Sequence, residues 1–517
     1  MGLALAIDYT LLIISRYRDE LADGADPERA LLRTMATAGR TVLFSALTVA
    51  LSMVAMVLFP MYFLKSFAYA GIAVVTFAAV AAVVVAPAAI VLLGDRLDAL
   101  DVRRFVRRLF GRPEPVRKPA EQTFWYRCTK YAMRRAVPIG VLIVALLLLL
   151  GAPFLGAKWG FPDDRVLPIT ASARQVGDDL RTNFAVDSAQ NATVVIPDTR
   201  DLRPGDLDRY AADLSRVPDV SSVSAPGGTF EDGRRVGPPS AATGAKDGSA
   251  FLTVTSTAPL FSDASEDQLN RLHDVATPGD VPVQVTGVAQ INRDSSSAIT
   301  SRLPMVLGVI AVITFVLLFL LTGSVILPLK ALVLNVLSLT AAFGALVWIF
   351  QEGHLGALGT TPTGTLVANM PVLLFCIAFG LSMDYEVFLV SRIREYWLAS
   401  AHTDASPQSR NDESVALGLA RTGRVVTAAA LLMSISFAAL IAAEVSFMRT
   451  FGVGLTLAVL ADATLVRMAL VPAFMHLLGR WNWWAPKPLA RLHERIGISE
   501  SGSARSEERT VESAATR

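Results

Sequence analysis

Nine hydrophobic stretches, separated by polar and charged residues, set the pattern of this chain. They run approximately over residues 1–16, 41–59, 66–93, 137–157, 304–322, 326–350, 367–390, 425–443 and 448–478. Most of them match the roughly 20 apolar residues that an α-helix needs to cross a bilayer. The pattern predicts a polytopic α-helical membrane protein with about nine transmembrane helices.

Residues 158–302 follow a different pattern. Short alternating runs are typical of strands, and amphipathic runs are typical of helices. In chain order they are a strand at 191–197, a helix near 205–216, a strand at 220–225, a Gly/Pro-rich loop at 226–248, a strand at 251–258, a helix near 264–275 and a strand at 281–287. The order βαββαβ predicts one α+β domain with the ferredoxin-like arrangement.

Basic residues indicate the orientation. Segment 95–135 holds twelve Lys/Arg against five Asp/Glu, so the positive-inside rule places it in the cytoplasm. Alternation of the helices then puts 158–302 on the extracytoplasmic side of the cell membrane and the C-terminus in the cytoplasm. Within the basic segment, 98–110 has four arginines opposite an apolar face. This suits either a helix lying on anionic headgroups or a solvated linker.

The composition narrows the chemistry. The chain is 53% hydrophobic, with a net charge of +2. Its two cysteines, Cys128 and Cys376, fall in different regions and cannot give a disulfide framework. No Cys, His or carboxylate cluster has the spacing of metal ligands, no nucleophile–base pair stands out, and His273 is isolated. We expect no enzymatic activity, no cofactor or metal, and no nucleic-acid partner.

An Asp-Tyr pair occurs twice inside a hydrophobic stretch. Residues 2–20 read GLALAIDYTLLIISRYRDE, and residues 378–395 read AFGLSMDYEVFLVSRIRE. In both, a Ser-Arg pair follows at the same spacing, so the copies are offset by 376 residues. A carboxylate inside the membrane costs about 2.5–3.5 kcal/mol even on the lenient insertion scale, which makes it a functional candidate by default. The candidates for a proton relay are Asp8, Tyr9, Asp384 and Tyr385.

Position and chemistry favour this hypothesis. About 12 Å of helix separates each aspartate from Arg16 or Arg392 at the end of its apolar run, so both lie near the middle of the bilayer. Burial disfavours the charged carboxylate, which could then load and release a proton. Each tyrosine could pair with the opposite aspartate, and the small residues Ala4 and Gly380 would let the two helices approach closely. The alternative is an inert hydrogen-bonded pair.

A third carboxylate, Asp462, lies in the last hydrophobic stretch, with Arg467 five residues later. The first half of the chain has Ala78 and Val83 at the matching places. A structural ion pair is therefore favoured over a relay role, and the two residues are a candidate secondary polar pair.

The duplication extends beyond the Asp-Tyr motif. Segments that match at offsets of 384 or 385 are 38–50 with 422–434, 65–67 with 449–451, and 87–96 with 472–481. They define two homologous three-helix blocks, 1–96 and 375–481. Parallel repeats of this kind are one known way to build a transporter.

The two Asp-Tyr motifs, with the Gly-Arg and Leu-Leu-Gly helices after them, closely resemble the large mycobacterial-type membrane protein family (MMPL) of the resistance-nodulation-division superfamily. The resemblance covers the chain except the tail and residues 98–120. It implies two halves, each with one helix, an outer porter domain and five helices. Against that template the chain lacks three helices and one porter domain, as an N-terminally truncated fragment, a wrongly assigned start or one piece of a split gene would.

Six regions are expected along the chain. They are 1–96, the three-helix block of the truncated first repeat; 97–136, a basic cytoplasmic linker; 137–157, the transmembrane helix that opens the second repeat; 158–302, the extracytoplasmic porter domain; 303–481, the five-helix transmembrane block of the second repeat; and 482–517, a cytoplasmic tail that is largely disordered.

The resemblance implies a function: export of lipids or other hydrophobic compounds across the inner membrane, driven by the proton-motive force. Its partners would be membrane lipids, a hydrophobic or lipidic substrate and protons, with a homo-oligomer or accessory membrane proteins left open. Two alternatives remain, a non-transporting sterol-sensing-like lipid-binding scaffold and an inactive fragment of a transporter.

Overall fold

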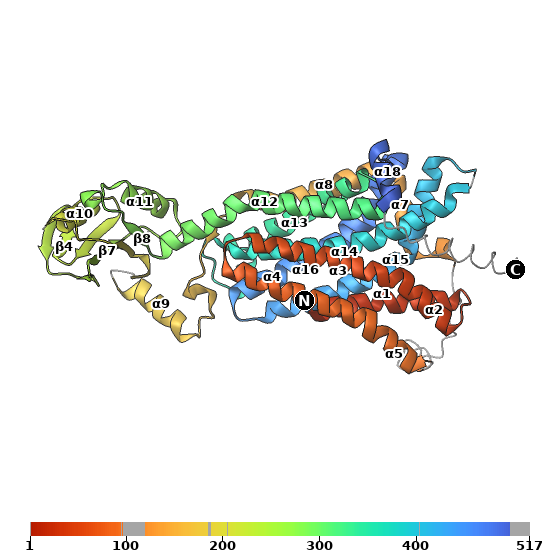
Figure 1. Ribbon diagram of the computed structural model, residues 1–517, viewed down its shortest axis with the longest axis horizontal. Coiled ribbons are helices and arrows are strands. Elements are labelled where there is room, and N and C mark those ends of the chain that lie inside the picture. Colours follow the sequence, from red (N-terminus) through yellow and green to blue (C-terminus); the bar gives the residue numbers. More distant parts are fainter. Residues whose placement is uncertain are drawn as a thin grey trace.

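The computed structural model describes residues 2–94, 96, 119–184, 188–203, 205–402 and 404–496. A bundle of long helices forms one end of an elongated molecule, and a sheet domain, from β2 to β8, forms the other (Figure 1). Helix α12 (Val288–Thr322) runs without a break from the sheet domain into the bundle. The predicted amphipathic helix at 98–110 lies outside the described residues.

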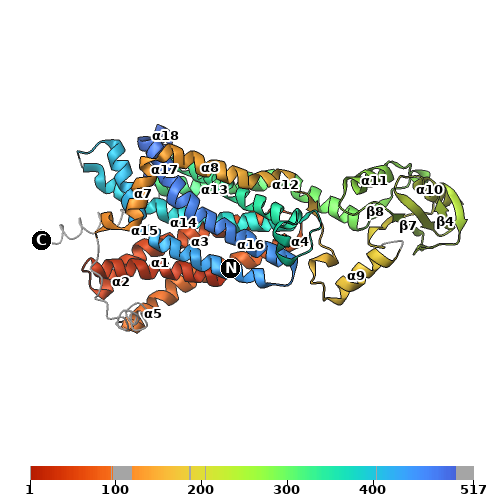
Figure 2. The ribbon, with the colours of Figure 1, turned by 180° about the vertical axis from the view of Figure 1, so that it is seen from behind.

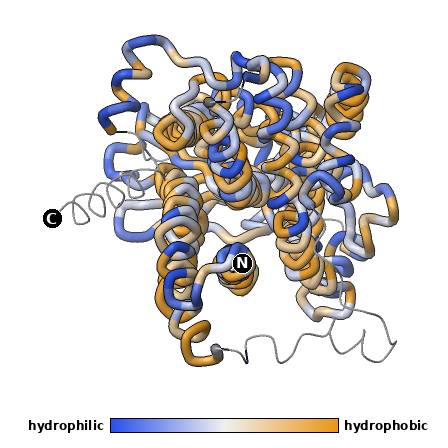
Figure 3. The backbone as a smooth tube through the Cα atoms, turned by 90° about the vertical axis from the view of Figure 1, so that its right-hand side faces the viewer, coloured by the Kyte–Doolittle hydropathy of each residue, from blue (hydrophilic) through white to orange (hydrophobic). Residues whose placement is uncertain are grey.

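The bundle contains helices α1 to α8 and α12 to α18, apart from α6. Their bounds are α1 (Gly2–Ala22), α2 (Pro27–Thr34), α3 (Arg40–Ala55), α4 (Tyr62–Val80), α5 (Ala86–Leu93), α7 (Phe124–Arg134), α8 (Ala136–Gly151), α13 (Ile326–Leu346), α14 (Asn369–Ala399), α15 (Pro407–Ala438), α16 (Ser446–Ala461), α17 (Val471–Leu478) and α18 (Lys487–Ile496). Seen along its length, the bundle consists of largely hydrophobic helices with hydrophilic connections at the near end (Figure 3).

In the part of the chain that the structure describes, eight helical segments are long and apolar enough to cross a membrane. They are Pro27–Leu58, Tyr62–Leu93, Ala136–Gly156, Val288–Thr322, Ile326–Gln351, Asn369–Ala399, Pro407–Ala442 and Ser446–Trp483. Each overlaps one predicted stretch. The remaining stretch, 1–16, lies in α1, which is not among the eight: Asp8 interrupts its apolar run, Arg16 ends the run, and Arg18 follows in the same helix. The predicted number of nine is therefore not confirmed.

Helix α14 is the centre of the bundle. In its most apolar stretch of 18 residues, 89% is buried inside the protein, against 17% in the corresponding stretch of Ala136–Gly156. A helix that is apolar all round belongs inside a large core or against lipid. Helix α14 therefore lies in the core, whereas α8 presents most of its surface to the surroundings.

The sequence repeat is visible in the local structure. A π-helical segment interrupts the last helix of each block, Ala81–Val85 in the first and Asp462–Leu470 in the second. Each of these helices ends at a glycine with nearly the same backbone conformation: φ 45° and ψ −125° at Gly94, φ 50° and ψ −122° at Gly479. A positive φ favours glycine because it has no Cβ.

The sheet domain is antiparallel throughout. Its strands are β2 (Ala192–Ile196), β3 (Val220–Ala225), β4 (Gly228–Glu231), β5 (Arg234–Gly237), β6 (Gly244–Lys246), β7 (Ser249–Ser256) and β8 (Gln284–Thr286). They lie in the order β5-β4-β3-β7-β2-β8, and β6 pairs with β7. Helices α10 (Asp206–Leu214) and α11 (Asp263–Asp274) follow β2 and β7 in the chain. Buried side chains on alternate positions of β2 contribute to the core between sheet and helices.

The segment 226–248 is not the loop that its glycines and prolines predicted. It forms β4, β5 and β6 because two Asp-Gly pairs make tight hairpins. Asp232 and Gly233 have φ of 45° and 78° and join β4 to β5, whereas Asp247 and Gly248, at 53° and 76°, join β6 to β7. Two successive positive φ values are the signature of the type I′ turn, which Asp-Gly favours.

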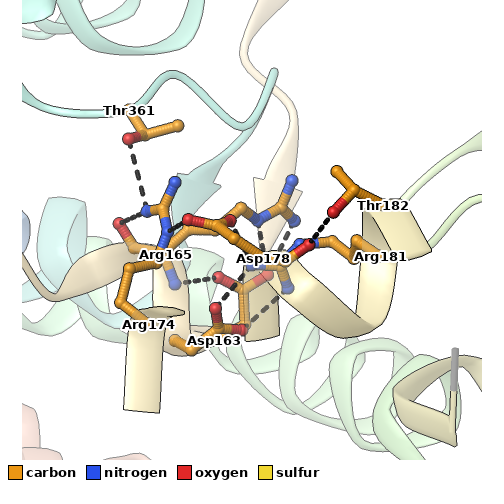
Figure 4. Close-up of polar contacts among 8 residues, drawn as sticks. Asp163, Arg165, Arg174, Asp178, Arg181, Thr182 and Thr361 are labelled. Carbon is orange, nitrogen blue, oxygen red and sulfur yellow. Dashed lines mark hydrogen bonds and ion pairs between the residues drawn. The ribbon is translucent and has the colours of Figure 1, made fainter. Parts of the chain in front are cut away.

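A network of arginines and aspartates joins residues 163–183 to the loop before α14 (Figure 4). It lies on the segment after α8 and on α9 (Ser172–Asn183), between the two parts of the molecule (Figure 2). Arg174 donates to the Asp178 carboxylate at 2.7 Å and to the Thr361 hydroxyl at 3.3 Å, in the loop before α14. Arg181 holds Asp164 at 2.5–2.9 Å, and this hydrogen bond lowers the pKa of Asp164.

The predicted tail, 482–517, is folded over its first part. Asn482 is fully buried and donates to the carbonyls of Met475 and Gly479 at 2.7 Å. The Ser324 hydroxyl donates to the Asn482 carbonyl at 2.6 Å, and α18 follows. The first part of the expected tail thus caps the bundle up to Ile496, and the part from about Ser499 that was expected to be disordered lies outside the described residues.

Candidate functional site

The two Asp-Tyr pairs meet inside the bundle. Asp8 and Asp384 are only 8% and 6% exposed, and both tyrosines are buried. The charges of the two carboxylates act on each other. Asp8 also interacts with the Tyr385 side chain, and Asp384 with that of Tyr9. Each tyrosine is therefore close to the aspartate of the other copy, although the Tyr385 hydroxyl donates to Met433 Sδ at 3.2 Å.

The close approach expected at Gly380 involves a different helix. A Cβ at Gly380 would lie 2.5 Å from Ser52 Oγ and 3.4 Å from Val49 Cα, both in α3. Helix α14 packs on α3, and α1 packs on α15. Each Asp-Tyr helix is thus packed on the second helix of the opposite block, so the prediction that Gly380 lets α1 and α14 touch is wrong.

Ser45 in α3 completes one side of the site. Its hydroxyl donates to Asp384 Oδ1 and lies 3.4 Å from the Tyr9 hydroxyl oxygen. The matching place in the second block is Ala429. Sequence reasoning missed Ser45, although a hydroxyl opposite an alanine in matched segments was a usable signal. The two halves of the site therefore differ in their hydrogen bonding.

The predicted Asp462–Arg467 pair forms and lies beside the Asp-Tyr site. Arg467 Nε donates to Asp462 Oδ2 at 2.8 Å, and its guanidinium lies 5.4 Å from the centroid of the Tyr385 ring. Arg467 also donates to the Ser382 carbonyl and hydroxyl in α14. Residues five apart meet here because the segment is π-helical, in which hydrogen bonds join i and i+5.

Two further buried charges were missed. Glu386 Oε2 lies 3.6 Å from Arg467 Nη1, and Glu386 Oε1 lies 3.8 Å from Lys330 Nζ, too long for a hydrogen bond. Glu386 directly follows the second Asp-Tyr, where the first copy has Thr10. Lys330 is the one charged residue in the stretch 326–350. Both were overlooked because only duplicated positions drew attention.

The cluster has more carboxyl groups than cations. Four acids (Asp8, Asp384, Glu386 and Asp462) and two bases (Lys330 and Arg467) are buried in this core, so four minus two leaves a formal charge of −2 if all are ionised. Uncompensated charge is costly in a protein interior. Within the described residues, Asp8 and Asp384 form no ion pair. The arrangement can therefore bind protons at these two aspartates, and in that same part of the chain no group of three or more His, Cys, Asp or Glu is placed to hold a metal.

An apolar groove lies at the end of the bundle nearest the sheet domain. Its volume is about 240 Å³, and its walls come from α12, α13 and α14 together with the residues after α8. Aromatic and aliphatic side chains dominate the lining, among them Phe154, Trp159, Leu303, Phe343 and Phe375. Such a surface suits an apolar ligand.

Eight apolar spans and a buried cluster of ionisable side chains define a multi-pass membrane protein. Residues 1–139 and 166–497 match the sequence model of the MMPL family. The chain belongs to the MMPL family, as its motifs predicted.

Several known membrane proteins are similar in sequence to this chain. The Streptomyces coelicolor membrane protein SCO6666 is 39% identical over 97% of this chain and 64% of its own length. The trehalose monomycolate exporter MmpL3 of Mycobacterium tuberculosis is 36% identical over 97% of this chain and 54% of its own length. The mycolic acid-containing lipids exporter MmpL11 of Mycolicibacterium smegmatis is 31% identical, with 96% and 50% covered. The chain thus spans about half to two thirds of the length of these relatives.

Among solved structures, a crystal structure of SecDF aligns with a TM-score of 0.48 and 14% identity. It covers 92% of this chain and 54% of the other.

Proposed function

We propose that this chain takes part in proton-motive-force-driven export of lipids or other hydrophobic compounds across the inner membrane. One observation carries the proposal: two aspartates 376 residues apart in the chain come together in the core of the bundle, each with a tyrosine of the other copy. Structural packing alone does not require carboxyl groups there, because apolar residues pack a core without the cost of burying charge.

In this proposal Asp8 and Asp384 bind and release the proton, and Tyr9 and Tyr385 pass it or hold the carboxyl groups in place. The Asp462–Arg467 pair and Glu386 set the electrostatic surroundings of Tyr385. A proton that crosses 100 mV releases about 2.3 kcal/mol, enough to bias a conformational equilibrium. Since α1 packs on α15 and α14 on α3, a change of charge at the aspartates would act on the contacts between the two blocks.

Two observations favour a lipidic substrate. The relatives MmpL3 and MmpL11 are named as exporters of trehalose monomycolate and of mycolic acid-containing lipids. The apolar groove between α12, α13 and α14 gives a hydrophobic molecule a place to leave the bilayer, next to the sheet domain.

We assign the sheet domain as a ferredoxin-like porter domain on the extracytoplasmic side. Its central strands lie in the order β3-β7-β2-β8, which is the second, third, first and fourth strand of a βαββαβ unit. The basic segment 95–135 favours a cytoplasmic position for the opposite end of the bundle. A helical bundle that spans the membrane between the cytoplasmic basic segment and the extracytoplasmic porter domain is consistent with export out of the cell.

Substitution of one carboxyl group tests the relay. Asp384→Asn keeps the shape of the side chain but removes its titratable carboxyl group. We therefore expect lipid export by the chain, measured in proteoliposomes with an imposed pH gradient, to fall to background. Asp23→Asn, at an exposed aspartate just beyond α1, is the matched control and should export normally. Normal export by a folded Asp384→Asn variant would overturn the relay.

A further inference from the structure

A second cavity lies at the end of the bundle away from the sheet domain. Its volume is about 350 Å³. The ends of the two Asp-Tyr helices, α1 and α14, line it together with α15 and the segment before α3. Both copies of the Ser-Arg motif, Ser15-Arg16 and Ser391-Arg392, are in its wall, so the cavity lies between the two halves of the repeat.

Positive charge dominates this cavity. Its wall contains Arg16, Arg392, Arg394 and Arg421 against two acids, Asp19 and Glu395, so four bases minus two acids leave a formal charge of +2. Of these, Arg392 pairs with Glu395 at 2.5 Å. All four arginines line this one cavity, so they share one neighbourhood. A dense group of arginines is typical of a site for phosphate or carboxylate, since guanidinium groups bind such anions through two hydrogen bonds.

Arg16 has a donor without an acceptor. One of its terminal nitrogens pairs with Glu20 at 2.8 Å, but its Nε is buried and has no hydrogen-bond partner among the described residues. A buried donor without a partner costs roughly 1–3 kcal/mol, so an anionic oxygen placed in the cavity would relieve that cost.

Part of the remaining wall is apolar, next to the hydroxyl groups of Ser15, Thr37, Thr41, Ser391 and Thr422. Aliphatic and aromatic side chains stand beside the arginines: Leu12, Leu321, Phe388, Leu398 and Val425. A small inorganic anion would leave this surface uncovered. A molecule with an anionic head and an apolar chain would cover both parts of the wall.

We propose that the cavity binds the phosphate group of an anionic phospholipid from the cytoplasmic leaflet. The assignment to that leaflet rests on the orientation given under Proposed function. Anionic lipids are enriched there and attract clusters of Lys and Arg. Because the ligand contacts Arg16 on α1 and Arg392 on α14, it links the ends of both Asp-Tyr helices and couples lipid composition to their relative position.

Binding is tested with the full chain in nanodiscs of neutral phosphatidylcholine, titrated with dioctanoyl phosphatidylglycerol. Arg16→Gln and Arg421→Gln should each weaken binding about tenfold, which corresponds to about 1.4 kcal/mol. Arg29→Gln is the control, because that side chain is 78% exposed on α2 and does not line the cavity. A melting temperature equal to that of the wild type shows that a variant folds. If only one of Arg16→Gln and Arg421→Gln folds, that variant is enough for the test.

Two further probes separate the sources of phosphate. Dioctanoylglycerol, which lacks the phosphate, and glycerol phosphate, which lacks the chains, should both bind much more weakly than the phospholipid. Equal binding of glycerol phosphate would overturn the lipid assignment in favour of a soluble phosphate ester. Equal binding of dioctanoylglycerol, or unchanged phosphatidylglycerol binding in both variants, would overturn the site. None of these measurements uses a proton gradient, so their failure leaves the transport proposal standing.

Discussion

The ionisable side chains of the core divide into a matched and an unmatched set. Asp8 and Asp384 occupy equivalent positions in the two blocks. The other ionisable residues, Glu386, Asp462 and Arg467, have no ionisable counterpart, because the equivalent positions of the first block are Thr10, Ala78 and Val83. The matched aspartates lack ion pairs among the described residues, and the unmatched groups form them. We infer that protons bind at the matched pair, while the unmatched set makes one half electrostatically different from the other.

The ion pairs around Glu386 give a prediction for stability. Glu386→Leu leaves Lys330 buried without a carboxylate, while Arg467 keeps Asp462. Breaking a buried pair on one side typically costs about 3–5 kcal/mol, so the melting temperature in detergent should fall clearly. The double variant Lys330→Met with Glu386→Leu replaces both charges by apolar groups and should regain most of the loss. A double variant as unstable as the single one would show that the Lys330–Glu386 pair is not the cause.

How far the site could be predicted depends on what the repeat reveals. The Asp-Tyr pairs stand out because they occur twice, and the Asp462–Arg467 pair because its members are close in sequence. Lys330 and Glu386 lie on different helices, α13 and α14, and Ser45 is one of many hydroxyls in apolar helices. Only the three-dimensional packing of α3, α13 and α14 brings them to the aspartates, and hydrophobic periodicity carries no information on such pairings.

At the level of elements, α14 owes its central position partly to Gly380. The Ser52 hydroxyl occupies the space that a side chain would need, and it donates to the Cys376 carbonyl at 3.2 Å across the α3–α14 contact. This close approach fixes α3, and with it Ser45, against the second Asp-Tyr helix.

Gly380→Ala should therefore destabilise the protein by about 1–3 kcal/mol, the usual cost of overpacking, because Ser52 has to move and lose its interhelical hydrogen bond. Gly308→Ala in α12 is the matched control, since a Cβ there meets nothing within 4 Å. Alanine is about 1 kcal/mol better than glycine inside a helix, so the control should be neutral or more stable. Unfolding in detergent measures both, and equal effects would contradict this packing argument.

The arginine–aspartate network between α9 and the loop before α14 gives a prediction with a pH dependence. The hydrogen bond from Arg181 lowers the pKa of Asp164 in the folded protein. The ionised carboxylate therefore stabilises the fold at every pH above its unfolded pKa of about 3.9. This stabilisation is lost as the pH falls through the lower pKa of the folded state. Asp164→Asn should therefore speed hydrogen exchange in Ser172–Asn183 at neutral pH, with Asp179→Asn, exposed on the same helix, as control.

In strong acid, where Asp164 is protonated in the wild type, the wild type and the Asp164→Asn variant should show the same hydrogen exchange in α9. A difference that persists there, or an equal effect of the control, would show that the network does not hold α9.

The elements themselves were more predictable than their partners. Strands and helices of the sheet domain start and end within a few residues of the predicted positions, because alternation and amphipathicity record burial directly. The exception, 226–248, was misread because glycine and proline content outweighed the two Asp-Gly signals, at Asp232 and Asp247. The first helix was counted as a span from its apolar residues, although Asp8 interrupts the apolar run and Arg16 ends it early.

Over the whole molecule, the two three-helix blocks enclose the aspartates, and α12 joins this core to the sheet domain as one continuous helix. Each Asp-Tyr helix rests on the opposite block, so the blocks cannot move relative to each other without moving the aspartates. We infer that this exchange of contacts couples protonation in the core to the apolar groove and the sheet domain. Neither the exchange nor the groove could be derived from the sequence, which shows that the blocks are similar but not how they pack.

The most direct test follows proton and lipid movement together. The 517-residue chain is reconstituted in liposomes that hold a pH-sensitive dye and a labelled lipid, and a pH gradient is imposed. We predict that lipid movement rises with the gradient, returns to background when a protonophore collapses it, and is absent with Asp8→Asn or Asp384→Asn. Lipid movement that ignores the gradient, or persists in both variants, would contradict proton-coupled export, and no lipid movement under any gradient would favour a non-transporting lipid-binding scaffold.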